Sequence, residues 1–192
     1  CWQDPYAFEP QITEKEQKRF KAGICYDIYE KLGAHPMTVK GIPGVYFAVW
    51  APNAMRVSLV GDFNLWDGRR LPMRRLPDSG IFELFVPGLS AGTLYKYEIK
   101  ARNGLVFLKA DPYANETEES PGTASVVTDL SGFEWKDQDW MARRKKCDVK
   151  KEAMAVYEMH LGSWKRKENG ELYNFRELAP LVAAYVKKMN YT

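Results

Sequence analysis

Short apolar runs separated by turn-forming residues fill the middle of the chain. From residue 95 to 100, apolar and charged side chains alternate, with Tyr95, Tyr97 and Ile99 set against Lys96, Glu98 and Lys100. This period of two predicts a strand with one buried face and one face in water. Asn103-Gly104 predicts a hairpin turn after it. Further strands are predicted at Val45–Trp50, Arg56–Val60, Ile81–Val86, Leu105–Leu108 and Ala124–Val127.

Short strands at this spacing are typical of an immunoglobulin-like β-sandwich, here over about residues 45–128. The chain before it carries helical signals. Thr13 and Glu16 have the spacing of a capping box, and Gly23 is a typical helix stop. The predicted elements are an extended tail over 1–10, a helix over about 14–22 and a helical turn over Tyr26–Leu32.

The pattern changes again after residue 130. Residues 131–152 are charged and aperiodic, which predicts a linker with some ordered turns. Ala153–Leu161 then predicts a strand. A helix over about Phe175–Met189 follows, and Pro180 is expected to kink it or to delay its start. Asn174 and Glu177 form its capping box, and its apolar stripe consists of Leu178, Leu181, Val182, Tyr185, Val186 and Met189.

One strand followed by one helix cannot bury a parallel strand, so this last part needs partners that the sequence lacks. The fold class is therefore mainly β: a sandwich followed by one strand and one helix of an incomplete unit. The chain also begins at Cys1 rather than Met, which we interpret as truncation. The predicted divisions are 1–22, a tail and linker helix; 23–130, the sandwich; 131–152, a linker; and 153–192, the incomplete strand–helix unit.

Charge and composition exclude several classes of function. The net charge of +3 gives no argument for nucleic acid or a membrane surface. The basic run Arg143–Lys146 is surrounded by acidic residues, which favours a solvated linker over a nucleic-acid patch. Three widely spaced cysteines favour a reducing cytoplasm over a disulfide scaffold. His35 and His160 have no second ligand at metal spacing, so we predict no metal site and no cofactor. No apolar stretch is long enough for a membrane helix.

The segment Val60–Gly68 is the densest candidate for binding chemistry. It predicts a strand end that leads into a turn, with Trp66 beside that turn. An exposed indole can stack on the apolar face of a glucose ring, while Asn64 and Lys96 can meet the hydroxyls. The alternative is that Trp66 closes one end of the sandwich core, and the residues alone leave both interpretations open.

The tetrapeptide Asp4-Pro5-Tyr6-Ala7 recurs at residues 111–114. The separation is about one sandwich domain of ~100 residues. The repeat suggests that the chain begins with the tail of a preceding copy of the same module.

Several runs in this order resemble the bacterial-type 1,4-alpha-glucan (glycogen) branching enzymes. They are Tyr29–Pro36, Phe47–Ala54, Val60–Arg70, Tyr95–Glu98, Lys109–Ala114 and Tyr157–Trp164. The last of them is similar to the first strand of the catalytic barrel in that family. The resemblance therefore implies that residues 153–192 are the start of an incomplete (β/α)8 barrel of the α-amylase type. The resemblance covers essentially the whole chain.

The resemblance implies an enzyme that cuts an α-1,4-glucan bond and transfers the freed oligosaccharide to a 6-hydroxyl, forming an α-1,6 branch. Such enzymes resemble retaining α-amylases, whose catalytic carboxylates lie on later barrel strands. This chain therefore has no catalytic residue, and we expect it to be inactive alone. Glu158 and His160 are interpreted as structural. The implied partners are α-1,4-glucans (glycogen, amylose or maltooligosaccharides) and the rest of the barrel.

Related glycogen-binding modules contact glucan through residues that correspond here to Trp66, Lys96 and Thr123. The chain departs from that pattern at two positions. A second stacking Trp falls near Val106 or Phe107, and an Asn corresponds to Ser125. The module is therefore expected to bind weakly or to brace the barrel. Two other interpretations stay open: a stand-alone regulatory glycogen-binding module, and the module of a debranching enzyme.

Overall fold

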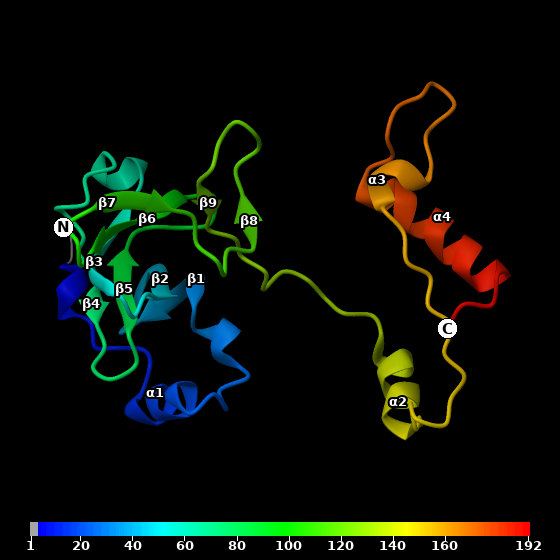
Figure 1. Cartoon of the computed structure of the whole chain (residues 1–192), viewed down its shortest axis with the longest axis horizontal. Coiled ribbons are helices and arrows are strands. Elements are labelled where there is room, and N and C mark those ends of the chain that lie inside the picture. The colour runs from blue at the N-terminus through cyan, green and yellow to red at the C-terminus, as the bar shows by residue number, and fades with distance from the viewer. Residues whose placement is uncertain (1–3) are drawn as a thin grey trace. The chain divides into compact units, whose positions relative to one another are not determined.

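The computed structural model describes residues 4–192. The chain divides into two compact units, and the division falls between Phe133 and Glu134. The first unit consists mainly of strands, and the second contains three helices joined by irregular segments (Figure 1).

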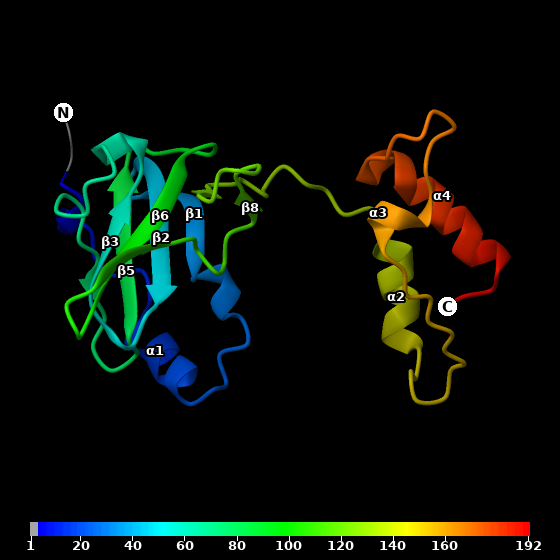
Figure 2. The same cartoon turned by 45° about the horizontal axis from the view of Figure 1, so that its top comes forward.

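Among the described residues, the first unit forms two antiparallel sheets (Figure 2). One sheet has the strand order β1-β2-β5-β4; the other has β3-β6-β9-β8, with β7 also paired to β6. The strands are β1 Gly33–Val39, β2 Ile42–Trp50, β3 Ala54–Val60, β4 Arg74–Arg75, β5 Ile81–Pro87, β6 Leu94–Ala101, β7 Val106–Lys109, β8 Glu116–Thr117 and β9 Ser125–Val126. The predicted mainly β fold of this region is confirmed.

Side chains from both sheets meet in one apolar core. Phe47 of β2 and Leu59 of β3 are fully buried in it, as are Tyr95 and Tyr97 of β6. The rings of Phe47 and Tyr95 pack edge to face with centroids 5.0 Å apart, a favoured arrangement for aromatic pairs. The alternation along β6 therefore has the physical cause that the sequence suggested, since only its inward residues reach this core.

The buried tyrosine hydroxyls need partners, and Asp111 supplies them. Its Oδ2 accepts hydrogen bonds from Tyr95 at 2.7 Å and from Tyr97 at 2.9 Å. The Asp111 amide donates to Ser125 Oγ at 2.8 Å. Burial raises the pKa of the Asp111 carboxyl. This network ties the segment after β7 to β6 and β9, and it leaves neither hydroxyl unpaired in the core.

The first sheet is also covered on its outer face. A second core joins Tyr46 of β2 and Phe85 of β5 to Phe8 and Ile12 of the N-terminal segment. Helix α1 (Glu14–Lys21) follows that segment, with the predicted capping box and with Gly23 at φ +72° after its end. Burial on both faces explains why β2 reads as an almost continuous apolar run rather than an alternating one.

The prediction of an extended tail over residues 1–10 is wrong for Pro5–Ala7, which form the 3₁₀ helix η1. The Asp4 side chain caps this helix by accepting the Tyr6 amide at 2.9 Å. Residues 1–3 of that prediction lie outside the described residues. The segment is attached to the sandwich, because the Tyr6 hydroxyl donates to the Pro72 carbonyl at 2.8 Å.

Asp111–Ala114 folds in the same way as the tetrapeptide that it repeats. The Asp111 carboxylate accepts the Tyr113 amide at 2.8 Å, and its carbonyl accepts the Ala114 amide at 3.2 Å. The corresponding distances at Asp4 are 2.9 and 3.1 Å. The repeat is therefore one of local structure as well as of sequence.

Strand β1 was not predicted. It is an edge strand whose Pro36 lies opposite Val45 of β2, and only an edge strand tolerates a proline in this way. Lys40 and Gly41, both at positive φ, form the two-residue turn into β2. The helical turn predicted before it over Tyr26–Leu32 shortens to the 3₁₀ helix η2 (Ile28–Glu30).

The second unit contains helix α2 (Gln138–Lys146) and helix α4 (Phe175–Lys188), with a short helix α3 (Leu161–Trp164) between them. The basic run forms the last turn of α2, where cations stabilise the helix C-terminus. Helix α4 has the predicted capping box of Asn174 and Glu177, and Pro180 lies inside it without displacing its start.

The strand predicted over Ala153–Leu161 is wrong for this chain. Residues 153–160 belong to no strand, and Leu161 begins α3. Among the described residues, no neighbouring strand is present to receive its ladder of backbone hydrogen bonds, and an unpaired strand is not stable in water. Met154 and Val156 are accordingly 71% and 76% exposed.

Glu83 of β5 provides a test of how the N-terminal segment is held. This buried carboxylate accepts hydrogen bonds from the Tyr46 hydroxyl at 2.6 Å and from the Gln11 and Ile12 amides at 3.1 and 3.4 Å. We expect Glu83→Ala to lower the free energy of unfolding by about 3 kcal/mol, because two buried donors and one partly buried donor lose their acceptor. Urea denaturation measures this. The exposed control Glu119→Ala should change it by less than about 0.5 kcal/mol, and equal effects would contradict the assignment.

The Glu83→Gln variant adds a pH test. Burial raises the pKa of Glu83 above its ordinary value of 4.5. The folded state therefore holds this proton more tightly than the unfolded state, and stability falls as pH rises above that value. Relative to Glu83→Gln, the wild type should lose stability between pH 4.5 and 7. A constant difference across that range would be inconsistent with burial of this carboxyl.

Candidate functional site

The candidate site begins where β3 ends and the chain turns through residues 61–68. Asn64 is buried, and its side chain joins two backbone groups: Oδ1 accepts the Gly61 amide at 3.1 Å, and Nδ2 donates to the Leu59 carbonyl at 2.9 Å. The sequence predicted that the Asn64 side chain contacts glucan hydroxyls. The structure instead places its amide inside the loop, where it substitutes for backbone hydrogen bonds.

Trp66 follows in an unusual backbone conformation. Leu65 and Trp66 are both left-handed, with φ of 59° and 57°, a region that L-residues other than glycine rarely occupy. The Trp66 side chain is half-buried, and its Nε1–H donates to Asp62 Oδ1 at 2.7 Å. The polar edge of the indole is therefore satisfied within the loop.

Lys96 and Thr123, which the family resemblance groups as glucan contacts, lie next to each other. The Lys96 Nζ donates to Thr123 Oγ1 at 2.6 Å. Lys96 is half-buried and Thr123 is exposed. Lys96 lies opposite Val60 in the β3–β6 register, next to the residue that begins the Trp66 loop. Since Tyr95 and Tyr97 point into the core, Lys96 points to the outer face of this sheet.

The far end of the loop lies on the same outer face. A Cβ added to Gly68 would collide with the Glu98 carboxylate, and Glu98 is ion-paired with Arg56. Glu98 is the next outward residue of β6 after Lys96. The structure thus brings the Trp66 loop, Lys96 and Thr123 to one face. Sequence reasoning missed Asp62, Gly68 and Glu98, although the alternation in β6 already placed Glu98 beside Lys96.

Asp67 shapes the same turn. Its carboxylate accepts the backbone amide of Arg69 at 3.0 Å and two bonds from the Arg69 guanidinium at 2.9 and 2.8 Å. Hydrogen bonding from Arg69 lowers the pKa of the Asp67 carboxyl. The Asp67 carboxylate is therefore charged at neutral pH, and both of its oxygens already accept hydrogen bonds from Arg69.

Two positions at which the chain departs from related modules have other surroundings here: the place of the second stacking Trp, near Val106 or Phe107, and the place of the Asn, at Ser125. Phe107 lies opposite Ile99 in the hairpin, and Lys109 Nζ stands 5.6 Å from the centre of its ring. Val106 is 52% exposed. Ser125 is fully buried, and its hydroxyl accepts the Asp111 amide. No second indole plate is available at these positions.

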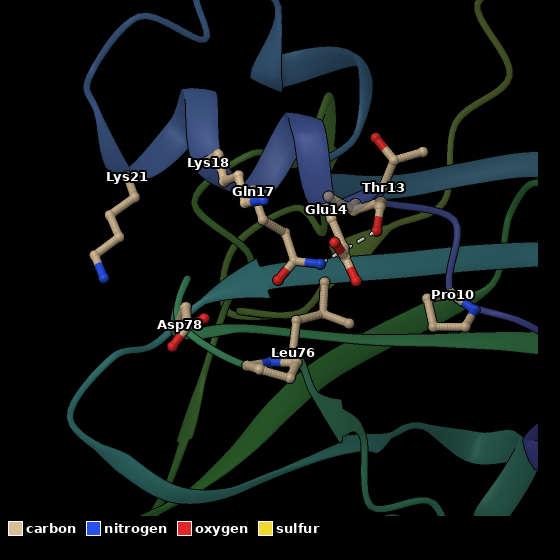
Figure 3. Close-up of a pocket in the computed structure, with 10 residues that line it drawn as sticks. Pro10, Thr13, Glu14, Gln17, Lys18, Lys21, Leu76 and Asp78 are labelled. Atoms are coloured by element: carbon tan, nitrogen blue, oxygen red, sulfur yellow. Dashed lines mark hydrogen bonds between the residues drawn. The ribbon is translucent and has the colours of Figure 1, made fainter.

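A hollow of about 700 Å³ lies elsewhere on the first unit, between α1 and the turn before β5 (Figure 3). Lys18 and Lys21 line it from the helix, and Leu76 and Asp78 line it from the turn. It has no aromatic wall on which a sugar ring could stack. Residues 4–192 also contain no group of three or more His, Cys, Asp or Glu side chains able to hold a metal ion. No helix in the same range has the length and apolar character needed to cross a membrane.

Comparison with known proteins shows what the chain is similar to. Residues 31–114 match the family model of carbohydrate-binding module 48 (isoamylase N-terminal domain). The 1,4-alpha-glucan branching enzyme of Cellvibrio japonicus is 52% identical over 98% of this chain, and that of Rubrobacter xylanophilus is 51% identical over 99%. The chain spans 26% of the length of each.

Among solved structures, ligand-free PulA from Klebsiella pneumoniae is 27% identical, with a TM-score of 0.43 over 57% of this chain and 11% of that chain. This likeness is too low to carry an argument. The sequence comparisons are more informative, because about half of all positions are identical along nearly the whole chain. The chain is therefore similar along nearly its whole length to part of the 1,4-alpha-glucan branching enzymes, and its residues 31–114 match carbohydrate-binding module 48.

Proposed function

We propose that the first unit holds α-1,4-glucan for a branching enzyme. Trp66 is the stacking platform, and Lys96 and Thr123 contact the sugar hydroxyls. One observation carries this proposal: the Trp66 loop and the Lys96–Thr123 pair share the outer face of one sheet. An aromatic plate beside a cation and a hydroxyl suits a chain of glucose rings, each with an apolar face and a polar rim.

The whole enzyme would cut an α-1,4 bond and transfer the freed oligosaccharide to a 6-hydroxyl. The relatives carry the name of this activity. A retaining mechanism needs two carboxyl groups about 5–5.5 Å apart. Glu158 is exposed, and His160 Nδ1 lies 3.0 Å from Ser163 Oγ. We propose that both are structural rather than catalytic. The catalytic carboxylates are expected outside this chain, and a cytoplasmic location remains our expectation.

The second unit is proposed to supply the first strand and helix of the catalytic barrel. Contacts within the second unit support this proposal. Ala155 exchanges hydrogen bonds with Thr192, donating to Oγ1 at 2.9 Å and accepting the amide at 3.2 Å. Tyr157 packs against Tyr185 of α4, with ring centroids 5.3 Å apart. The chain after the helix thus returns beside the segment before it, as in a βαβ unit. The rest of the barrel would cover the exposed Met154.

A second candidate role is to brace the barrel without binding glucan. The missing second indole favours it, and so does β7, an edge strand with exposed apolar residues Val106 and Leu108. Such an edge is normally covered.

Titration calorimetry with maltoheptaose distinguishes the two roles. If the module is a glucan tether, Trp66→Ala should weaken binding by at least about tenfold, or about 1.4 kcal/mol, because the stacking plate is removed. Trp140→Ala is the matched control, since it removes an exposed indole from the second unit. Absence of binding by the folded wild type would leave the bracing role.

The chain by itself should not branch amylose. Incubation with amylose, followed by iodine staining, should leave the colour unchanged, because no pair of catalytic carboxylates is expected in it. A colour shift typical of branched glucan would refute this expectation.

A further inference from the structure

The loop that carries Trp66 is conformationally costly. Two successive residues, Leu65 and Trp66, occupy the left-handed region without being glycine. Each such residue crowds its Cβ against the backbone. Strain of this kind persists only where the surroundings fix it, and it concentrates at functional sites. Leu65 is 75% exposed, so its own burial does not account for the conformation.

The N-terminal end of the loop is fixed by hydrogen bonds. The Gly61 carbonyl accepts both the Asn64 amide at 3.1 Å and the Trp66 amide at 2.9 Å. The buried Asn64 side chain holds the Gly61 amide and the Leu59 carbonyl. The backbone that leads to Trp66 is therefore held by hydrogen bonds to Leu59 of β3 and to Gly61, which directly follows β3.

The C-terminal end of the loop packs against the same sheet. Gly68 lies directly against the Glu98 carboxylate, so a side chain at this position would require Glu98 to move. Glu98 is itself held by the Arg56 guanidinium, and both residues are partly buried. Trp66 is thus attached on both sides to the outer face of one sheet.

These contacts set the backbone but not the orientation of the indole ring about its side-chain torsions. The Asp62 carboxylate supplies that constraint, because its Oδ1 accepts the Trp66 Nε1–H at 2.7 Å. A charge-assisted hydrogen bond of this length is directional. It also occupies the only donor of the indole. Asp62 is exposed on the loop, so the core does not require its charge.

We infer that Asp62 is a positioning residue that locks the Trp66 ring for glucan stacking. The ring is then offered as an apolar plate, and the recognition of hydroxyls is left to Lys96 and Thr123. Pre-ordering of the ring lowers the entropy lost on binding. This inference rests on the proposed glucan-binding function.

The test uses the whole chain in a double-mutant cycle of wild type, Asp62→Ala, Trp66→Phe and the double variant. Phenylalanine keeps an aromatic plate but has no N–H. Maltoheptaose affinity is measured by calorimetry, and indole N–H resonances are measured by ¹H–¹⁵N NMR. The Trp50 indole, which donates to the Ser79 carbonyl at 3.1 Å, is the internal control.

We expect Asp62→Ala to weaken binding about fivefold in the wild type and less than about twofold in the Trp66→Phe background, because the coupling passes through the N–H. The Trp66 indole proton should move upfield in Asp62→Ala while that of Trp50 stays in place. Asp62→Asn, which keeps an acceptor oxygen, should restore most of the affinity.

Equal losses in both backgrounds would overturn the inference, and so would an unmoved Trp66 resonance. If the wild type does not bind maltoheptaose, the proposed function fails and the glucan role of Asp62 fails with it. A moved Trp66 resonance would then still support the lock on the ring. The NMR result therefore separates failure of the lock from failure of the proposed function.

Discussion

The inward packing of Tyr95 and Tyr97 is the interaction on which the arrangement of the site depends. Both rings lie in the core between the sheets, and Asp111 satisfies both hydroxyls. Because side chains alternate along a strand, this burial sends Lys96 and Glu98 to the outer face. One contacts Thr123, and the other supports the loop of Trp66. A shift of one residue in β6 would place the tyrosines in water and the charges in the core.

The other sheet has a different task. Both of its faces are covered, by the sandwich core on one side and by the N-terminal segment on the other. Glu83 is the polar group that makes the second contact specific, because its carboxylate gathers donors from β2 and from the segment before α1. The residues before the sandwich are thus part of its fold. The repeated Asp-Pro-Tyr-Ala turn marks both ends of this arrangement with the same local structure.

The proposed glucan site has one aromatic plate, so it depends strongly on how that plate is held. The relatives are named 1,4-alpha-glucan branching enzymes, and an α-1,4-glucan offers many equivalent glucose rings. A single ordered plate suits a tether that binds weakly and releases readily. Strain in the loop is the physical cost of that order, and it is offset by hydrogen bonds to the edge of β3 and by close packing on β6.

The sequence by itself determined the elements whose causes are local. The capping boxes of α1 and α4 and the turn at Asn103-Gly104 depend on near neighbours in the chain. The period of two in β6 is also visible in the sequence, because each residue's character follows the face on which it lies. The grouping of Trp66 with Lys96 and Thr123 came from family resemblance, whereas their shared face follows from the β3–β6 register. Only the tertiary structure decided that Asn64 is internal, that β1 forms despite Pro36, and that Ala153–Leu161 is not a strand. Each of these depends on partners distant in sequence, because a buried amide, an edge strand and a ladder of backbone hydrogen bonds are defined by what lies across from them.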